Sequence, residues 1–322
     1  MAWSQELSAV LSVVVYPGMG FLILLSLLYE WIDRKFVARL QNRYGPLYTG
    51  PSGILQPFAD IVKLLSKEDI EPKGVDHVVF RAAPILMLAL PLLGLLVVPI
   101  NSQTALLAFE GDLIFMIFLL TLIAALVFLA GYASANRFGT IGGLRAALQM
   151  LGYEVPLSVS LVGPAIMAGS LSISRIVQWQ TRTGFWMILM QPVGFAISIL
   201  CLLAELEKIP FDIPEAETEI VAGWLTEYSG RKLALLRLAG DVEMVLACGL
   251  LAALYLGGPA APAPWLSIVW FLVKTVAVLL IFSNLRSLFA RFRIDQMISG
   301  CWKYLLPLAS IQLIAVELML GR

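Results

Sequence analysis

The segment DLIFMIFLLTLIAALVFLAGY, residues 112–132, decides the fold class, because its only charged residue is Asp112 at its first position. A helix needs about 20 predominantly apolar residues to cross the hydrocarbon core of a bilayer. The rest of the chain has the same character: of 322 residues, 60% are hydrophobic and only 14% are charged. Soluble domains average roughly 45–50% apolar and 25% charged residues. We therefore expect an all-α polytopic membrane protein.

Seven further stretches have the length and hydropathy of a membrane span. The eight expected transmembrane helices lie near residues 8–32, 79–99, 112–132, 151–173, 185–205, 237–256, 264–283 and 302–320. The first stretch lacks a basic segment before it and a small-residue cleavage site after it, so we expect a retained helix rather than a signal peptide. Because no low-complexity tract or repeat divides the chain, we expect residues 1–322 to form a single membrane domain, with amphipathic interfacial helices in its inward loops.

Basic residues are distributed unequally over the connections between these spans. If the N-terminus faces outward, 18 of the 22 Lys and Arg residues fall on the inward side. The outward side has only Arg175, Arg182 and Arg322, and Lys274 lies within a span. Cytoplasmic loops of membrane proteins carry such an excess of positive charge. We therefore expect a multi-pass protein of the inner (cytoplasmic) membrane, with both termini outside and the long loops inside.

The first inward loop combines a rigid turn region with an amphipathic segment. The stretch GPLYTGPSG (45–53) has enough glycine and proline to enforce tight, defined turns. In the following ILQPFADIVKLLSKE (54–68), apolar residues recur at helical spacing, and Asp60, Lys63 and Lys67 lie three to four residues apart. This pattern predicts a helix that lies at the membrane interface.

The second inward loop, NRFGTIGGLRAALQMLGYEVP (136–156), leads into the fourth expected span, with Glu154 at its start. A carboxylate within a span costs about 3 kcal/mol on insertion scales and more in simulations. A protein tolerates this cost where the group faces a wet cavity or a partner. We therefore interpret Glu154 as a functional acid rather than a structural one.

The third inward loop, within LLAELEKIPFDIPEAETEIVAGWLTEYSGRKLALL (202–236), is the most acidic part of the chain. Its seven acids are Glu205, Glu207, Asp212, Glu215, Glu217, Glu219 and Glu227. They alternate with large apolar residues, which indicates a partly buried segment rather than a solvated face. Carboxylates that repel one another in such a setting raise one another's pKa, and rows of them serve as proton relays in pumps.

Candidate ligands for metals and cofactors are few. Cys201, Cys248 and Cys301 lie far apart in apolar segments, and His77 is the only histidine. Because they form no CxxC pair or Cys/His cluster, they offer no site for zinc or for an iron–sulfur cluster. We expect no metal and no redox cofactor in this chain, so partner proteins must handle any electrons. The net charge of zero gives no electrostatic basis for binding nucleic acid.

Five motifs cover nearly the whole chain. They are IDRKFVARLQNRYGP (32–46), GPSGILQPFADIVKLLSKE (50–68), GGLRAALQMLGYEVPLS (142–158), AELEKIPFDIPEAETEIVAGWLTEYSG (204–230) and FRIDQMISGCWKYLLPL (292–308). In this order they resemble the H-subunit family of respiratory complex I, a membrane component of NADH-quinone oxidoreductase. Relatives of that family occur in energy-converting membrane-bound hydrogenases and archaeal sulfur-reductase-type complexes. The resemblance implies a membrane-arm protein that links a redox reaction to ion translocation.

The resemblance also implies two sets of site residues. A chain of carboxylates leads into the membrane, and its matching members here are Glu154, Glu205, Asp212 and Glu215. A chamber at the junction with the peripheral arm, where quinone binds in quinone-reducing members, is matched by Asp33, Arg34, Gln56, Asp60, Lys63, Arg145, Tyr153, Phe211, Glu217, Glu227, Arg293 and Asp295. The implied partners are peripheral-arm subunits that carry iron–sulfur clusters and resemble hydrogenase large and small subunits, antiporter-like membrane subunits, and lipid.

One segment departs from the family pattern. A glutamate of complex I members falls on Gly240 here, so Asp241 or Glu243 has to substitute for it in the carboxylate path. Arg237 also stands where complex I members have phenylalanine. These changes resemble the hydrogenase-type branch, whereas the long turn region at 45–53 resembles quinone-reducing members. The branch therefore remains open, as does the coupling ion, H⁺ or Na⁺.

Two functions of other classes compete with the ion-pump interpretation. An independent secondary transporter would have discontinuous helices with polar residues at mid-membrane, but most charges here cluster at the inward ends of the spans. A purely structural anchor would not need Glu154 and Glu205 at the ends of spans.

Overall fold

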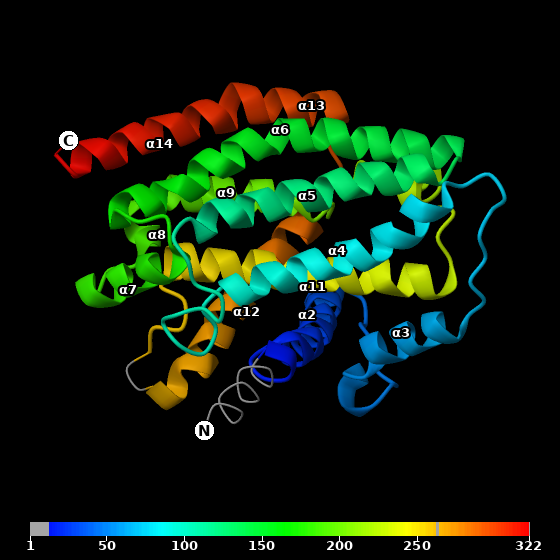
Figure 1. Cartoon of the computed structure of the whole chain (residues 1–322), viewed down its shortest axis with the longest axis horizontal. Coiled ribbons are helices and arrows are strands. Elements are labelled where there is room, and N and C mark those ends of the chain that lie inside the picture. Colours follow the sequence, from blue (N-terminus) through cyan, green and yellow to red (C-terminus); the bar gives the residue numbers. More distant parts are fainter. Residues whose placement is uncertain (1–12, 262–263, 322) are drawn as a thin grey trace.

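A computed structural model describes residues 13–261 and 264–321 of the chain (Figure 1). Its α-helices are α2 (Met19–Leu40), α3 (Gln56–Ser66), α4 (His77–Val97), α5 (Asp112–Ala133), α6 (Arg137–Ala168), α7 (Ile173–Thr183), α8 (Met187–Met190), α9 (Pro192–Glu205), α10 (Glu217–Ile220), α11 (Gly230–Leu256), α12 (Ser267–Leu288), α13 (Ile294–Gly300) and α14 (Leu306–Met319). Short turns of other helical types are η1 (Pro51–Gly53), η2 (Gly223–Leu225), η3 (Pro264–Leu266) and η4 (Cys301–Leu305). The expected all-α membrane fold is confirmed.

Among residues 13–261 and 264–321, six helical segments are long and apolar enough to cross a membrane. They are α4, α5, α6, α11, α12 and the continuous segment Ile294–Met319, which comprises α13, η4 and α14. Each corresponds to one of the eight stretches expected from hydropathy. The other two expected spans differ from the prediction, so the number eight is not confirmed.

The two exceptions have physical causes. The stretch expected at 8–32 corresponds to α2, whose last third is rich in charged residues, and its residues 8–12 lie outside the described part. The stretch expected at 185–205 is divided between α8 and α9, because Gln191 leaves the helical conformation and Pro192 begins the next helix. With 14 residues, α9 rises only about 21 Å along its axis, which is less than the bilayer core of about 30 Å.

A third difference concerns the segment 136–150, which the sequence suggests to be a loop and which is in fact the first half of α6. Its glycines are used for close packing rather than for turns. A Cβ added to Gly142 would lie 2.5 Å from the backbone nitrogen of Trp224, and one added to Gly143 would lie 3.0 Å from the carbonyl oxygen of Phe128. Glu154 therefore lies in the middle of a 32-residue helix and not at the start of a span.

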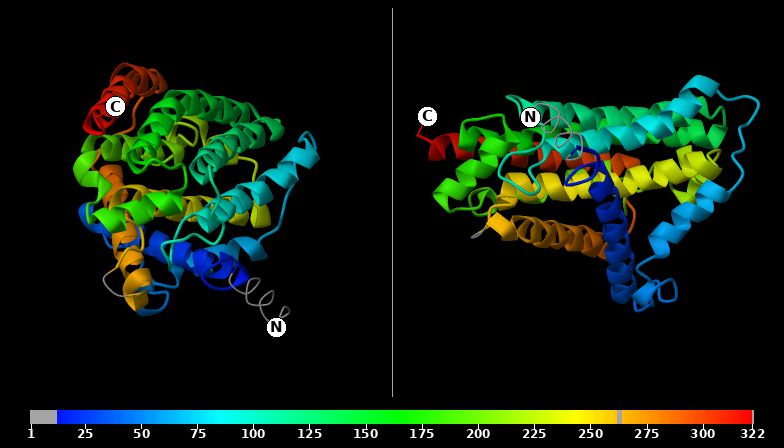
Figure 2. Two further views of the ribbon diagram at one scale, coloured as in Figure 1. Left: turned by 60° about the vertical axis from the view of Figure 1, so that its left-hand side comes forward. Right: turned by 60° about the horizontal axis from the view of Figure 1, so that its bottom comes forward.

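The helix α11 forms the centre of the bundle. Its residues 242–255 are buried without interruption, and it contacts α2, α4, α7, α9 and α12. Figure 1 shows α4, α5, α6 and α14 running roughly along the same axis as α11. Figure 2 shows that α2 crosses this axis steeply, and α2 contacts both α11 and α12.

The loops gather at two opposite ends of the bundle (Figures 1 and 2). At one end lie segments 66–76, 134–136, 206–229 and 289–293, which we call the loop end. They are joined there by the ion pairs Lys232–Asp69 (2.7 Å) and Arg145–Glu219 (2.6 Å). At the other end, Arg175 pairs with Glu110 (2.6 Å). The segments at the loop end are the inward loops of the predicted topology.

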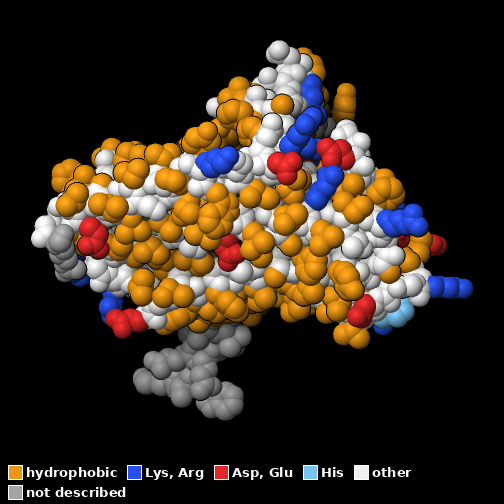
Figure 3. All heavy atoms as spheres, turned by 90° about the horizontal axis from the view of Figure 1, so that it is seen from above, with side chains coloured by type: hydrophobic (Ala, Val, Ile, Leu, Met, Phe, Trp, Pro, Cys, Tyr) orange, Lys and Arg blue, Asp and Glu red, His pale blue; other side chains and the backbone are white. Residues whose placement is uncertain are grey.

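The surface agrees with a membrane location. Figure 3 shows hydrophobic side chains over most of the visible face, with charged side chains concentrated toward one end. The spans expose large apolar residues to the surroundings, such as Phe118 on α5, Leu151 on α6 and Ile311 on α14. Such a surface fits contact with lipid tails or with neighbouring membrane subunits.

Candidate functional site

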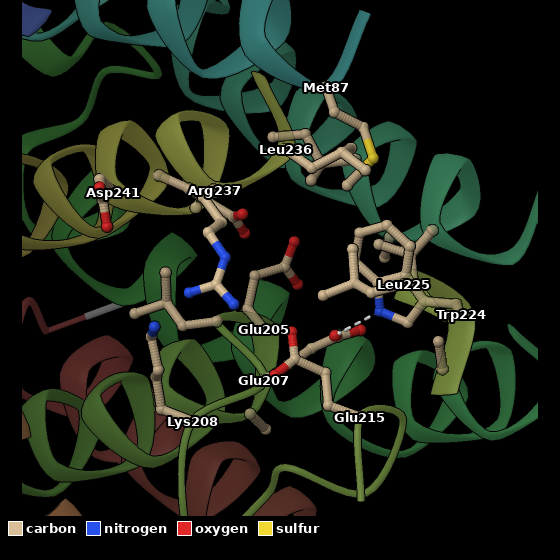
Figure 4. Close-up of a pocket in the computed structure, with 18 of the residues that line it drawn as sticks. Met87, Glu205, Glu207, Lys208, Glu215, Trp224, Leu225, Leu236, Arg237 and Asp241 are labelled. Atoms are coloured by element: carbon tan, nitrogen blue, oxygen red, sulfur yellow. Dashed lines mark hydrogen bonds between the residues drawn. The ribbon is translucent and has the colours of Figure 1, made fainter. Parts of the chain in front are cut away.

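A cavity of about 380 Å³ lies inside the bundle near the loop end. Its wall is formed by α2, α4, α5, α6, α9, α11 and α12 and by the segment 206–229. The charged side chains that line it are the acids Glu30, Glu205, Glu207, Glu215, Glu217, Asp241 and Glu243 and the bases Arg34, Lys208, Arg237 and Arg286. We call it the carboxylate cavity; Figure 4 shows part of it.

Glu205 enters the cavity from the last turn of α9. Its side chain is buried, and its Oε1 has no hydrogen-bond partner among the described residues. Tyr153 of α6 lines the cavity beside it. Gln149, one turn before Tyr153, donates from Nε2 to the carbonyl oxygens of Ala204 (2.8 Å) and Phe211 (2.9 Å). This amide therefore holds the end of α9 and the acidic loop against α6.

Glu207 and Glu215 lie beside Glu205 in Figure 4, with the three carboxylates directed toward one another. The Trp224 indole Nε1 donates to Glu207 Oε2 at 3.0 Å. Burial, and after it the neighbouring charge of Glu215, raise the pKa of Glu207 to about 8. Burial also raises the pKa of Glu215, although the positive charge of Lys208 opposes the change. Both acids therefore titrate closer to neutral pH than exposed glutamates do.

A second group of charges lies on the side of the cavity formed by α2 and α11. Arg34 pairs with Glu30 and, at 2.7 Å, with Asp60 of α3. Asp241 lies near Glu30. A smaller cavity of about 170 Å³ between α3 and α11 shares Arg34, Asp241 and Arg237 with the carboxylate cavity and is also lined by Asp60 and Lys63. The two cavities are thus neighbours, separated by these shared side chains.

Two acids of the expected path lie outside the lining of the carboxylate cavity. Glu154 is half-buried between α5 and α6, with Oε1 hydrogen-bonded to Thr121 Oγ1 at 2.5 Å. It still lies near enough to Glu205 for the two charges to interact. Asp212 instead forms a bidentate ion pair with Arg291, whose Nε and Nη2 donate at 2.7 and 2.5 Å. This pair fastens the acidic loop to the segment before α13.

Of the residues expected at the junction with a peripheral arm, some line the two cavities and the others do not. Tyr153 and Glu217 line the carboxylate cavity, Arg34 lines both cavities, and Asp60 and Lys63 line the smaller one. The others lie elsewhere and have structural contacts or exposed positions.

The remaining junction residues are placed as follows. Asp33 accepts from Ser283 and Arg286, both at 2.6 Å. Gln56 donates to Asp60 at 3.0 Å, Arg145 pairs with Glu219, and Glu227 accepts from Asn136. Phe211 packs against Phe292 with ring centroids 5.8 Å apart, and Arg293 and Asp295 are exposed at the start of α13.

The sequence reasoning missed several lining residues. They are Glu30, Glu207, Lys208, Arg237, Glu243 and Arg286. Glu207 was counted among the acids of its loop without a role, and Glu243 was considered only as a substitute for the glutamate replaced by Gly240. A signal for Glu30 and Glu243 was available, because each is an acid on an otherwise apolar helix.

Metal-binding geometry does not occur among residues 13–261 and 264–321: no three His, Cys, Asp or Glu side chains are grouped as a metal site there. The chemistry that the cavity offers is proton or cation exchange among carboxylates.

Comparisons with known proteins show the family to which the chain belongs. A family model described as NADH dehydrogenase matches residues 12–317. The H-subunit of the NADH-quinone oxidoreductase of Thermomicrobium roseum is 40% identical over 319 residues, which cover 91% of this chain and 92% of that protein. The chain belongs to the H-subunit family of complex I. It is therefore a multi-pass membrane component of a multisubunit complex, and the family resemblance inferred from the five motifs is confirmed.

Gly240, where the sequence departs from the family pattern, lines the carboxylate cavity. Both candidate substitutes for the predicted glutamate, Asp241 and Glu243, lie on α11 and line the carboxylate cavity. Glu243 is buried, with Oε1 unpartnered among the described residues. The cavity therefore has two acids within three residues of Gly240, the position at which the resemblance predicts a glutamate.

Proposed function

We propose that this subunit couples the redox reaction of an NADH-quinone oxidoreductase to the translocation of H⁺, or of Na⁺, and that the ion path begins in the carboxylate cavity. One observation carries the proposal: acids follow one another from the loop end to Glu154 in the middle of α6. Glu215 is near enough to Glu207, Glu207 to Glu205, and Glu205 to Glu154 for neighbouring charges to interact.

The size and lining of the carboxylate cavity support this proposal. A water molecule occupies about 30 Å³ in the liquid, so a cavity of about 380 Å³ has room for several. The unpartnered oxygens of Glu205 and Glu243 are suited to bind such waters or to hold protons. Water between carboxylates is an efficient carrier of protons, whereas a dry apolar core of the same size would block them.

Glu154 is the proposed exit of the path from this subunit. It lies with Thr121 between α5 and α6, near the exposed apolar residues Phe118, Leu151 and Val155. An ionisable group on such a surface is costly unless a partner covers it. We infer that a neighbouring, antiporter-like membrane subunit packs there and receives the ion.

The loop end is the proposed docking surface for the peripheral arm. From the positive-inside excess we infer that these loops face the cytoplasm and that both termini lie outside. Lys67, at the loop end, and Lys63, one turn before it on α3, are exposed and available to acidic partner surfaces. Lys232, by contrast, is nearly buried and pairs with Asp69 and Glu71, each at 2.7 Å, so its role is to hold loops together within this chain.

Quinone is proposed to approach this subunit near α3 rather than to fill the carboxylate cavity. A lining of seven acids and four bases suits water and ions, not an apolar ring and tail. Arg34, Asp60 and Lys63 border the smaller cavity, which adjoins both the interfacial helix α3 and the acids. The similarity to a component of an NADH-quinone oxidoreductase across 91% of the chain favours this quinone branch over a hydrogenase or sulfur reductase without quinone.

The test is the variant Glu205→Gln in the assembled enzyme, because glutamine keeps the shape and hydrogen-bonding capacity but cannot bind and release a proton. We expect normal assembly on native gels and loss of ion uptake by vesicles driven by the enzyme's own redox reaction. Glu219→Gln is the matched control, since Glu219 pairs with Arg145 at the surface outside the cavity lining. Wild-type ion uptake in an assembled Glu205→Gln enzyme would contradict the proposal.

A further inference from the structure

Glu207 has an unusual position for a glutamate, because it follows the end of α9 in the left-handed backbone region with φ of 50°. The amide of Glu207 donates to the carbonyl of Ala204 (3.2 Å), and the amide of Lys208 donates to that of Leu203 (3.4 Å). These two bonds form the turn with which many helices end, and glycine normally occupies the left-handed position. A residue with a Cβ is strained there.

The strain coincides with a second unfavourable feature, since the Glu207 carboxylate is directed into the bundle. It lines the carboxylate cavity, where Glu205 lies on one side and Glu215 on the other (Figure 4). Strained backbone that persists in a folded protein is concentrated at functional sites. A glycine at this position would remove the strain and the half-buried charge together, so folding alone does not explain the glutamate.

One hydrogen bond orients this side chain. The indole of Trp224, carried by the turn η2, donates to Oε2 of Glu207 at 3.0 Å. That turn is itself held against α6, where a Cβ on Gly142 would collide with the Trp224 backbone. The indole occupies one carboxylate oxygen in a fixed direction and leaves the other to exchange a proton.

Besides Glu207, the charged side chains Glu30 and Arg34 of α2, Glu217 of the acidic loop, Asp241 of α11 and Arg286 of α12 also line the cavity. The groups nearest to Glu207 come from α6, α9, α11 and the acidic loop. They are Tyr153 on α6, Glu205 on α9, Lys208 and Glu215 in the acidic loop, and Arg237 and Glu243 on α11. The contributions of α4 and α5 to the lining are apolar. Three acids and two bases therefore surround one carboxylate, and the base nearest in the chain, Lys208, acts on Glu207 and on Glu215 alike.

We propose that Glu207 is a proton-carrying residue of this subunit, which takes a proton from the Glu215 side of the cavity and passes it to Glu205. The proposal rests on the ion-path function proposed above and adds a specific step to it. In the first transfer, one O–H bond breaks on the donor and one forms on Glu207. In the second, the O–H bond of Glu207 breaks and one forms on Glu205. Water carries the proton where the oxygens do not touch. Nothing is oxidised or reduced.

The raised pKa of the Glu207 carboxyl agrees with a proton-carrying role. Burial and the charge of Glu215 raise the pKa of Glu207 to about 8, so that the carboxylate can both accept and release a proton near neutral pH. The bond from Trp224 favours the charged form and keeps the pKa from rising further. An acid with an ordinary pKa would stay ionised at neutral pH and would transfer protons poorly.

The experiment compares Glu207→Gln and Glu207→Gly in the assembled enzyme, with Glu205→Gln in parallel and Glu219→Gln as the surface control. Glutamine keeps the contact with Trp224 but removes the proton site. Glycine removes both and relieves the strained φ. We expect both Glu207 variants to assemble and to lose turnover and ion uptake by about 100-fold, as for the loss of a proton-transfer group. We expect an inflection near pH 8 in the turnover profile of the wild type and its loss in both variants.

A structural role for Glu207 predicts different results. Wild-type turnover in Glu207→Gln would overturn the inference, as would a Glu207→Gly enzyme that fails to assemble while Glu207→Gln works normally. If Glu205→Gln abolishes ion uptake while Glu207→Gln does not, only the role of Glu207 is rejected. If both variants pump like wild type, the proposed ion path is rejected as well.

Discussion

Replacing Glu207 by glutamine should change the pH dependence of the chain's stability. A buried acid whose folded pKa is raised binds its proton more tightly in the folded than in the unfolded state. Its favourable contribution is complete below the unfolded value of 4.5 and is lost as the pH rises to the folded value of about 8. Each pKa unit corresponds to about 1.4 kcal/mol, so the ionised side chain of the half-buried Glu207 destabilises the fold by at most about 5 kcal/mol.

Glutamine cannot ionise and therefore avoids this loss. Wild type and Glu207→Gln should melt at similar temperatures at pH 5, and the variant should melt higher at pH 9, by about 10 °C or less for a chain of this size. The assay is thermal denaturation of the chain in lipid nanodiscs, followed by tryptophan fluorescence between pH 5 and 9. A difference in melting temperature that does not vary with pH, or a variant that is less stable at pH 9, would refute the reasoning.

Two further predictions follow from the packing and the exposed lysines. Gly142→Ala should destabilise the protein by about 1–3 kcal/mol, because its Cβ would lie 2.5 Å from the backbone nitrogen of Trp224. The control is Gly240→Ala, where an added Cβ meets nothing within 4 Å. Equal melting temperatures for the two variants would contradict the packing argument. Amine-reactive crosslinkers on the intact complex should join Lys63 or Lys67, both exposed, to peripheral-arm subunits, and mass spectrometry that finds them joined only to membrane subunits would exclude the loop end as the docking surface.

Hydropathy predicts most of the spans because six helices are apolar over their full crossing length. It gives the wrong extent for α6, whose first half has the Gly and Arg content of a loop. Because glycine has no side chain whose polarity would indicate burial, the sequence does not distinguish a glycine in a flexible turn from one in a close contact, such as that of Gly142 with Trp224. The two cases differ only in tertiary packing.

The acids of the site were predictable to the extent that they cluster along the chain. Glu205 and Glu215 stand in one acidic loop and could be assigned together. Glu30 and Glu243 lie more than 200 positions apart, and only the crossing of α2 with α11 brings both to one cavity. Asp212 has the same local pattern as its neighbours but pairs with a distant arginine, which sequence spacing does not reveal.

The role of Glu207 was concealed for another reason. Helix endings of this kind are recognised from glycine, and the glutamate at this position gives no such signal. Its backbone conformation and its bond to Trp224 become visible only in the folded chain.

The most direct test of the ion path is the double variant Glu205→Gln/Glu154→Gln, purified within the whole enzyme and reconstituted into sealed vesicles. The measurement is the number of ions taken up for each electron transferred, with assembly verified on native gels. We expect this ratio to fall to near zero, with electron transfer slowed as well, because the two carboxylates lie in sequence along the path. A fully assembled double variant with the wild-type ratio would show that these acids are structural and would contradict the account.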